Sequence, residues 1–314
     1  MRRLILTISY FFFVMGMAHA QNVITVAPIG GDFSDPVDAL NAIGTTLPAS
    51  SAANRYLVIV EPGVYTVTQS VRMKPYVDLQ GSGIKTTVIR GAISFDDGGS
   101  VFGGQGVINA ASRSEIRQLT VRNTISSISG IAIAVIGTQG SLISDVRSVA
   151  RGNADSSGNW KYGIRIVDST NTRIVNVVAR GTSTDSTLCQ GAAIRNSNVT
   201  IIDSRLVGAV CGIGLGVSAD DASNVSIQGS LLRGEGSING LGISASSDTI
   251  GETTRVRVRH SKIIGEVLAG ISGELGVSDV RISHSEMTGP VRGNPVCFSV
   301  HDPGMAGLTS GCLP

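Results

Sequence analysis

The stretch NVTIIDSRLVG runs from Asn198 to Gly208, and NVSIQGSLLRG runs from Asn224 to Gly234. The two stretches carry nearly the same pattern 26 residues apart, each opening on Asn-Val and closing on Gly. Related segments close on further glycines at intervals of 29, 27, 26, 31 and 24 residues: Gly152, Gly181, Gly208, Gly234, Gly265 and Gly289. Periods of about 20 to 50 residues are typical of solenoids.

Each unit holds two short strands separated by a bend. In the first stretch Val199 and Ile201 alternate with polar residues, Ser204 interrupts the alternation, and Leu206 resumes it. Alternation places successive side chains on opposite faces of a strand, so a single interruption turns a corner while the apolar face stays inside. A third strand led by glycine, such as GIAIAV from Gly130, lies between successive closing glycines.

Three short strands in each unit predict an all-β fold, a right-handed single-stranded parallel β-helix with three sheets. No unit carries an apolar stripe of period 3.6 over about ten residues, which excludes a helical solenoid. A β-sandwich is the weaker alternative, because it would not require the bend residue to recur in register.

The bend residue forms a column four positions before the closing glycine, with Val177 as the exception: Ser148, Ser204, Ser230, Ser261 and Ser285. Stacked rungs lie about 4.8 Å apart, so these hydroxyls can form hydrogen bonds along the column. We interpret the column as scaffolding and not as a set of catalytic serines.

Two histidines precede serines of this column and should stack on the outer edge, His260 and His284. Stacked histidines can indicate a metal site. The same column offers no carboxylate or thiol, however, so we expect no metal there.

Residues 1–20 are predicted to be a signal peptide, because two arginines precede an apolar run that ends at Ala-His-Ala. The run is shorter than the roughly 20 apolar residues that a membrane anchor needs. We therefore expect a secreted or periplasmic protein with no membrane insertion after cleavage. The expected layout has one β-helix domain with a cap at each end: 21–314 overall, 21–60 for the N-terminal cap and first strand, 61–293 for the coils, and 294–314 for the C-terminal cap.

The ends of a solenoid need covers, because open strand edges pair with other chains. The segment DFSDPVDALNAIGTTL offers Asp35 as a helix cap and Pro36 at the first helical position. Its apolar residues Val37, Leu40 and Ile43 share one face. We expect this short helix to cover the N-terminal end.

An even number of cysteines, four, in an exported chain favours disulfides. Cys189 and Cys211 occupy nearly equivalent places on adjacent coils, within disulfide reach. We predict the pairs Cys189–Cys211 and Cys297–Cys312, against the alternative of free buried thiols in a reducing compartment.

The formal net charge is +2, and removal of two arginines with the signal peptide brings it close to zero. Nothing in the overall balance favours a nucleic acid or an anionic membrane as partner, and a polyanion-binding role would need a local patch. The chain has 40 glycines and one tryptophan, so its core must be aliphatic and thin. We expect a monomer.

The opening segments resemble a known family. The stretches VAPIGGDFSDPVDALNAI, RYLVIVEPGVYT and VRMKPYVDLQGSGIKTTVIRG, within residues 23 to 91, are similar to the first coils of pectin methylesterases and, more loosely, of the pectin lyase-like β-helix superfamily. PGVY and VDLQGSG recur in β-helix proteins of differing activity, so they indicate the fold more than the reaction.

The esterase resemblance implies two aspartates, an arginine and glutamines on one exposed sheet, acting as nucleophile, acid and base on a methyl ester. Asp155, in GNAD, would match the acid and base, although Ala154 stands where the family has glutamine. The nucleophile segment and the arginine segment have no counterpart in this chain.

Most outward positions of the glycine-led strands are small, and three residues on neighbouring coils break that pattern, Arg165, Asp168 and Arg195. They are candidate catalytic residues for a polysaccharide lyase or esterase. Beside them the longest loop presents candidate substrate-binding residues: Trp160, Lys161 and Tyr162. An indole that stacks on a sugar ring, flanked by cations for uronate carboxylates, would make a saccharide site. Alternatively, the aromatic residues cover a coil edge while the arginines are solvated.

No cofactor is expected. Asp220 and Asp221 could bind calcium, but acidic residues at such places commonly terminate strands. We therefore predict an exported, carbohydrate-associated binding or surface module without a complete catalytic set, with a polysaccharide as the possible partner. Two alternatives stay open: a polysaccharide-active enzyme of the pectinesterase or pectate lyase type, and a structural or adhesive solenoid.

Overall fold

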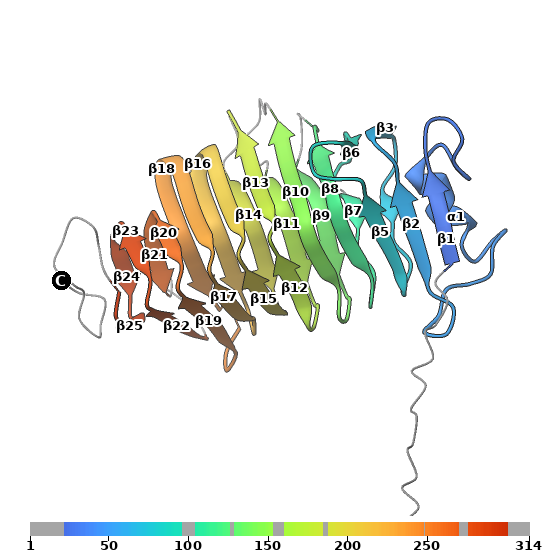
Figure 1. The fold of residues 1–314 in the computed structure, drawn as a ribbon. Coiled ribbons are helices and arrows are strands. Elements are labelled where there is room, and N and C mark those ends of the chain that lie inside the picture. The colour runs from blue at the N-terminus through green and yellow to red at the C-terminus, as the bar shows by residue number, and fades with distance from the viewer. Residues whose placement is uncertain are drawn as a thin grey trace, which may run out of the picture.

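The computed structural model describes residues 22–95, 104–125, 129–152, 160–184, 188–247, 249–269 and 276–300. The predicted signal peptide, Asp155 and Cys312 lie outside these residues. The described strands stack into a long solenoid with three faces, with the N-terminal helix at one end (Figure 1). All their ladder pairings are parallel, and together they form a right-handed parallel β-helix, as the sequence predicts.

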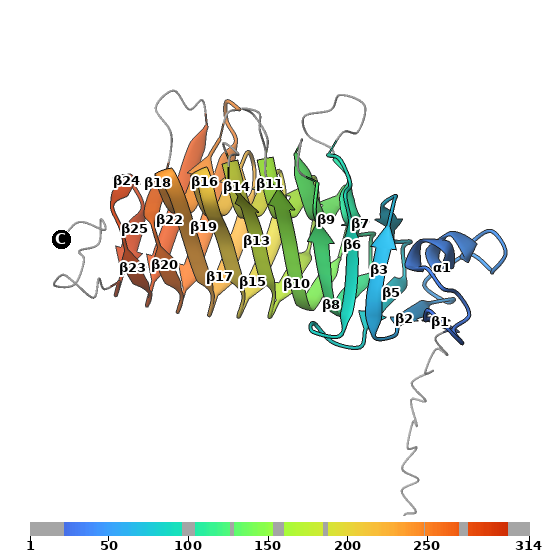
Figure 2. The ribbon, with the colours of Figure 1, turned by 90° about the horizontal axis from the view of Figure 1, so that it is seen from above.

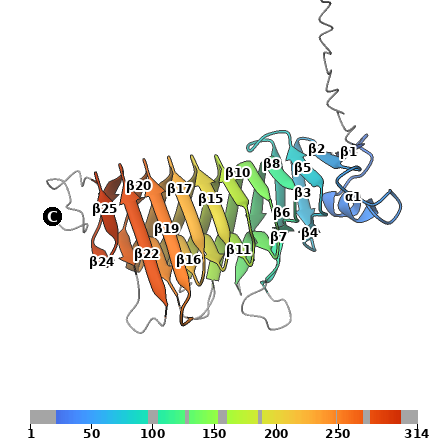
Figure 3. The same ribbon diagram turned by 90° about the horizontal axis from the view of Figure 1, so that it is seen from below.

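The first face is built from one strand of every rung, and these strands lie side by side along the axis (Figure 3). It comprises β1 (Asn22–Val26), β2 (Tyr56–Val60), β5 (Val77–Gly81), the first parts of β8 (Glu115–Asn123) and β10 (Leu142–Gly152), β12 (Thr172–Val175), β15 (Asn198–Ile202), β17 (Asn224–Gln228), β19 (Thr253–Arg259), β22 (Val277–Ser283) and β25 (Val296–Phe298).

The second face follows the bend. It comprises β3 (Gly63–Val67), β6 (Thr87–Gly91), the later parts of β8 and β10, β13 (Val178–Ser183), the first parts of β16 (Arg205–Asp220) and β18 (Leu231–Ser246), β20 (Lys262–Ile264) and β23 (Glu286–Thr288). The third face comprises β4 (Val71–Arg72), β7 (Gly106–Asn109), β9 (Gly130–Ile136), β11 (Trp160–Val167), β14 (Leu188–Arg195), the later parts of β16 and β18, β21 (Glu266–Ala269) and β24 (Val291–Gly293).

The core is a set of aliphatic columns that run along the solenoid. One column of the first face is at most 1% exposed on eight successive rungs: Leu79, Ile116, Ile143, Ile174, Ile201, Ile227, Val258 and Ile282. Burying each such side chain contributes about 1.5–3 kcal/mol of hydrophobic free energy. The alternating pattern of the sequence thus fixes which side of each strand faces inward.

The bend between the first and second faces uses a residue with left-handed backbone geometry. Asn and Asp tolerate this geometry better than most residues, and several rungs place them there, while later rungs use histidine: Asp145 (φ 52), Asn176 (φ 52), Asp203 (φ 48), His260 (φ 48) and His284 (φ 48). The two histidine rings stack with centroids 5.3 Å apart, as predicted. No cluster of three metal-binding side chains occurs among the described residues.

The predicted serine column is confirmed for four of its five members. The backbone N–H of Ser204 donates to Oγ of Ser230 (3.1 Å), and the same contact links Ser230 to Ser261 and Ser261 to Ser285. Each of these hydroxyls in turn donates to the carbonyl oxygen two residues earlier, as Ser204 does to Ile202 (2.8 Å).

Ser148 does not belong to this column, and its placement there was wrong. Its register partner on the next rung is Ala179, and its hydroxyl donates to the carbonyl oxygen of Gly163. The cause is that Gly152 pairs with Ser183, whereas Ala150 pairs with Gly181, so the last glycine of this unit lies two residues beyond the equivalent point. Aligning units on their last glycine therefore shifts this one unit by two residues.

The closing glycines are required where the second face turns into the third. A Cβ at Gly208 would overlap the carbonyl oxygen of Cys189, and one at Gly234 would overlap the backbone of Leu241. Because neighbouring backbones approach so closely, no side chain fits at these corners, which explains why the repeat keeps glycine there.

The N-terminal helix α1 (Pro36–Ala42) forms as predicted, with the Asp35 side chain accepting from the N–H of Val37 (2.6 Å). Val37, Leu40 and Ile43 are buried against the first rungs, so the helix covers that end of the core. No helix among the described residues has the length and apolar character to cross a membrane.

Cys189 and Cys211 form the predicted disulfide, with Cα atoms 6.0 Å apart on adjacent rungs. Cys297 is also disulfide-bonded, and its predicted partner Cys312 lies outside the described residues. The last described rung, β25, pairs with β22.

Candidate functional site

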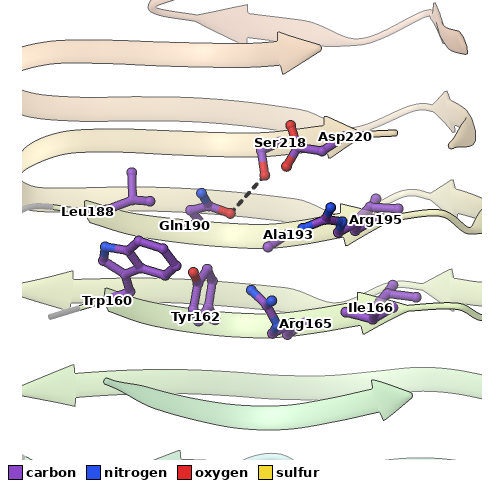
Figure 4. Close-up of a pocket in the computed structure, with 12 residues that line it drawn as sticks. Trp160, Tyr162, Arg165, Ile166, Leu188, Gln190, Ala193, Arg195, Ser218 and Asp220 are labelled. Carbon is purple, nitrogen blue, oxygen red and sulfur yellow. Dashed lines mark hydrogen bonds between the residues drawn. The ribbon is translucent and has the colours of Figure 1, made fainter. Parts of the chain in front are cut away.

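A groove of about 230 Å³ opens on the third face, over β11, β14 and β16. β11 contributes Trp160, Tyr162 and Arg165, whose side chains project from the strand toward the same space (Figure 4). Trp160 and Tyr162 lie two residues apart, as expected for one face of a strand. Arg165, three residues after Tyr162, projects to the same side of the strand. The reason is that Gly163 pairs with neither neighbouring strand, so the alternation of side chains shifts by one residue there.

The next two rungs complete the groove by register. Gln190 of β14 lies beside Tyr162, and Ser218 of β16 lies two rungs from Arg165 with Ala193 between them. The hydroxyl of Ser218 donates to Oε1 of Gln190 (2.9 Å), as the dashed line in Figure 4 shows. The side-chain amide of Gln190 is thereby held in place on the groove floor.

The aromatic pair is partly open to solvent. Trp160 is 37% exposed and Tyr162 is 2% exposed, and their rings meet edge to face with centroids 6.2 Å apart. The backbone N–H of Trp160 donates to the Oγ of Ser129 (3.0 Å), which fixes the start of β11. Burial raises the pKa of Tyr162 far above its usual range, so its phenol stays neutral.

Arg165 is held by aromatic rings. Its guanidinium carbon lies 5.0 Å from the ring centroid of Tyr162 and 5.1 Å from that of Phe95, within the range of cation–π attraction. Only 7% of Arg165 is exposed. The positive charge therefore sits at the floor of the groove with little water around it, where an anion would interact more strongly than at an open surface.

The far wall of the groove carries opposite charges. Arg195 pairs with Asp221 (2.6 Å), and Asp220 accepts a hydrogen bond from the hydroxyl of Ser246 (2.6 Å). Asp220 and Arg195 are register partners that both line the groove. The groove thus combines an indole face, two cations, an amide, a hydroxyl and one carboxylate.

Lys161 does not lie in the groove, although the sequence analysis predicted it there as a substrate-binding residue. Its side chain is fully buried, and Nζ donates to the carbonyl oxygen of Ile125 (2.9 Å). It therefore does not line the groove beside Trp160 and Tyr162. The reason is alternation: as the residue between two outward aromatic side chains, Lys161 points to the opposite side of β11.

Asp168 is a corner residue. It has a φ of 49° at the bend between the third and first faces, where its Oδ1 accepts from Nδ2 of Asn196 (2.7 Å). A second serine ladder follows this bend, unnoticed in the sequence: Ser169, Ser197 and Ser223. Asp168 is not among the residues that line the groove, and Asp155 lies outside the described residues.

Three residues of the site were missed from the sequence, namely Gln190, Ser218 and Phe95. Gln190 precedes Gly191 just as Tyr162 precedes Gly163, so extending the alignment of glycine-led strands would have found it. Ser218 follows from the same register. Phe95 comes from the segment after β6 and carries no periodic signal. Asp220, read as a strand-ending residue, lies on the groove wall.

Stacked parallel rungs, two corner ladders and a groove on the third face define a pectin lyase-like parallel β-helix. The chain belongs to the family described as rhamnogalacturonase A/epimerase, pectate lyase-like, whose model matches residues 23–257. Among curated proteins, none matches the chain.

Solved structures of similar architecture include YbhC from Escherichia coli, which is 13% identical with a TM-score of 0.53 over 97% of this chain and 88% of that chain. Pectin methylesterase from carrot is 15% identical, with a TM-score of 0.47 over 93% of this chain and 85% of that one. At this identity the likeness to YbhC supports the fold alone.

Proposed function

We propose that this protein binds an acidic polysaccharide in the groove of the third face. The observation that carries the proposal is that the exposed indole of Trp160 and the nearly buried guanidinium of Arg165 line the same groove, with the ring of Tyr162 between them (Figure 4). An aromatic face stacks on the C–H surface of a sugar ring, and a guanidinium binds a carboxylate through paired hydrogen bonds. A uronic acid presents both groups on one sugar.

The remaining groove residues fit the same ligand. Gln190 and Ser218 offer donors and acceptors for sugar hydroxyls, and Arg195 offers a second cation one rung away from Arg165. Export of the protein, to the periplasm or the medium, belongs to this proposal. It is supported by the apolar N-terminal segment and by the Cys189–Cys211 disulfide.

The test is calorimetric titration of the mature protein with a short oligogalacturonate. We expect wild type to bind and Trp160→Ala to bind at least tenfold more weakly, because the stacking surface is lost. Phe298→Ala is the matched control, since Phe298 is an exposed aromatic residue on β25, and it should bind as wild type does. Equal binding by Trp160→Ala, or no binding by wild type, would overturn the proposal.

A second candidate is catalysis on the same polymer, by a pectinesterase-like or pectate lyase-like reaction. The observation that favours it is the carboxylate of Asp220, which shares the groove with Arg165 and Arg195. Release of methanol, unsaturated product or reducing ends from pectin and polygalacturonate, lost in Asp220→Asn, would establish an enzyme. If all three products stay absent while the oligomer binds, the protein is a binding module.

A further inference from the structure

The second face carries a regular arrangement of cations outside the groove. Six successive rungs, formed by β8, β10, β13, β16, β18 and β20, each present one outward cation near the bend: Arg122, Arg147, Arg180, Arg205, Arg233 and Lys262. We call these six residues the cation zigzag. The strands that hold them are parallel to one another and are stacked side by side along the solenoid axis (Figure 2).

Register places these cations alternately in two columns. Arg147 pairs with Val178, which pairs with Arg205, so that Arg147 and Arg205 share the column nearer the bend. The column two residues further on has the reverse order, in which Val149 pairs with Arg180 and Arg180 with Val207. Arg122 and Arg233 continue that second column, and Lys262 continues the first. One positive charge therefore recurs at every rung, about 4.8 Å apart along the axis.

The central arginines of the zigzag differ from its last two cations in their ion pairing. Arg233 pairs with Glu235 and Lys262 with Glu286. Among the described residues Arg147, Arg180 and Arg205 form no ion pair. Nε of Arg180 is buried and has no hydrogen-bond partner there. Like charges on adjacent rungs repel one another, and a buried donor without an acceptor costs free energy, so this part of the face is complementary to an anion.

Aliphatic side chains fill the positions between the arginines. Val149, Val178 and Val207 line a depression of about 310 Å³ together with four of the arginines and one carboxylate, that of Glu235, which pairs with Arg233. Arginine and valine therefore alternate both within and between the two columns, so that each valine lies among cations. A polymer whose units each combine an apolar ring face with one carboxylate matches both features.

We propose that the cation zigzag is a second binding surface, on which a linear acidic polysaccharide lies along the solenoid axis. A duplex nucleic acid carries one charge per about 1.7 Å, far denser than one cation per rung. Single strands bind through aromatic stacking, and no aromatic side chain lines the depression. A polyuronate carries one carboxylate per sugar, which suits one guanidinium per rung. The surface shares its ligand class with the groove, but it lies on another face and does not require the groove to bind.

The experiment is gel retardation of the mature protein by long-chain polygalacturonate. The triple variant Arg147→Gln, Arg180→Gln, Arg205→Gln should need at least tenfold more polymer for half retardation, with a weaker dependence on salt. The matched control removes the same charge from the first face, Arg255→Gln, Arg257→Gln, Arg259→Gln, where three exposed arginines lie on β19. Equal losses in both variants would mean that total charge alone governs binding, which overturns the proposal.

Two further polymers, methyl-esterified pectin and duplex DNA, test whether the carboxylates and the type of polymer determine binding. Fully methyl-esterified pectin should not retard wild type, and duplex DNA should retard it less than polygalacturonate does. Retardation by DNA at lower concentration than by polygalacturonate would contradict the choice of polymer. The short oligogalacturonate tests the groove separately: Trp160→Ala should bind it at least tenfold more weakly, and the triple arginine variant should bind it as wild type does. Thermal unfolding of each variant confirms that it is folded.

Discussion

At the scale of single residues, Lys161 shows how position on a strand decides the role of a side chain. Its side chain passes over Gly152, where a Cβ would lie 2.6 Å from Cε of Lys161, and it ends against the carbonyl oxygen of Ile125. Burial lowers the pKa of Lys161 from its ordinary 10.5 to about 8, because removal from water disfavours the ammonium form. The residue is structural in its contacts, and its charge is sensitive to alkaline pH.

This pKa shift gives the protein a testable pH dependence. Between about pH 8 and 10.5 the unfolded chain holds a proton on Lys161 that the folded chain has lost, so folding stability rises with pH across that window. Relative to Lys161→Met, wild type should gain on the order of 2 kcal/mol in free energy of unfolding. Denaturant unfolding at pH 7.5 and 10.5 measures this gain. Lys85→Met, at an exposed lysine, is the control, and an unchanged gap between wild type and Lys161→Met would refute the assignment.

Some residues of the groove could be identified from the sequence, and others could not. Trp160, Tyr162, Arg165 and Arg195 could be selected from the sequence because each is a large or charged residue among small ones, and the structure brings them together. Asp168 could not be separated from them by type alone, because its place at a corner follows from its backbone conformation. Phe95 belongs to no repeat, and only the folded chain places it against Arg165.

At the scale of the strand and the bend, the serine ladder ties successive rungs together. Ser230 accepts from the N–H of Ser204 and donates to the carbonyl of Gln228. Ser230→Ala leaves the buried N–H of Ser204 without this acceptor, while the carbonyl of Gln228 still accepts from the N–H of Asp203, so the free energy of unfolding should fall by about 1–3 kcal/mol.

Ser226→Ala, at an exposed position of the neighbouring strand β17, should change stability by at most about 0.5 kcal/mol. Chemical denaturation of both variants measures the difference. A Ser230→Ala variant as stable as the control would show that the ladder does not contribute to stability.

The elements of the fold follow from the sequence wherever the repeat is regular. Alternation, the recurrent bend serine and the glycine at the tight corner each reflect one physical requirement, and together they give the three-faced solenoid. The failure at Ser148 arises because Gly152 lies two residues beyond the position that pairs with Gly181, which is occupied by Ala150, and a count from the closing glycine cannot detect this. The left-handed bend residues were likewise missed, because Asn, Asp and His share the conformation but not an obvious pattern.

At the scale of the whole molecule, the formal net charge conceals how charge is distributed. The chain totals only +2 before any processing, yet a cation recurs on six consecutive rungs of the second face. Such a surface arises only when distant segments are stacked in register, so composition alone could not predict it. Faces of different chemistry on one rigid solenoid would let the protein hold a short stretch of polymer in the groove and a longer stretch along its side.

The most direct test of the central claim is a crystal structure of the mature protein with a short oligogalacturonate. We expect a sugar ring stacked on the indole of Trp160, with a uronate carboxylate against Arg165 or Arg195 on the third face. A ligand that binds in solution but lies away from β11 and β14 in the crystal, or a groove that stays empty at saturating oligomer, would contradict it.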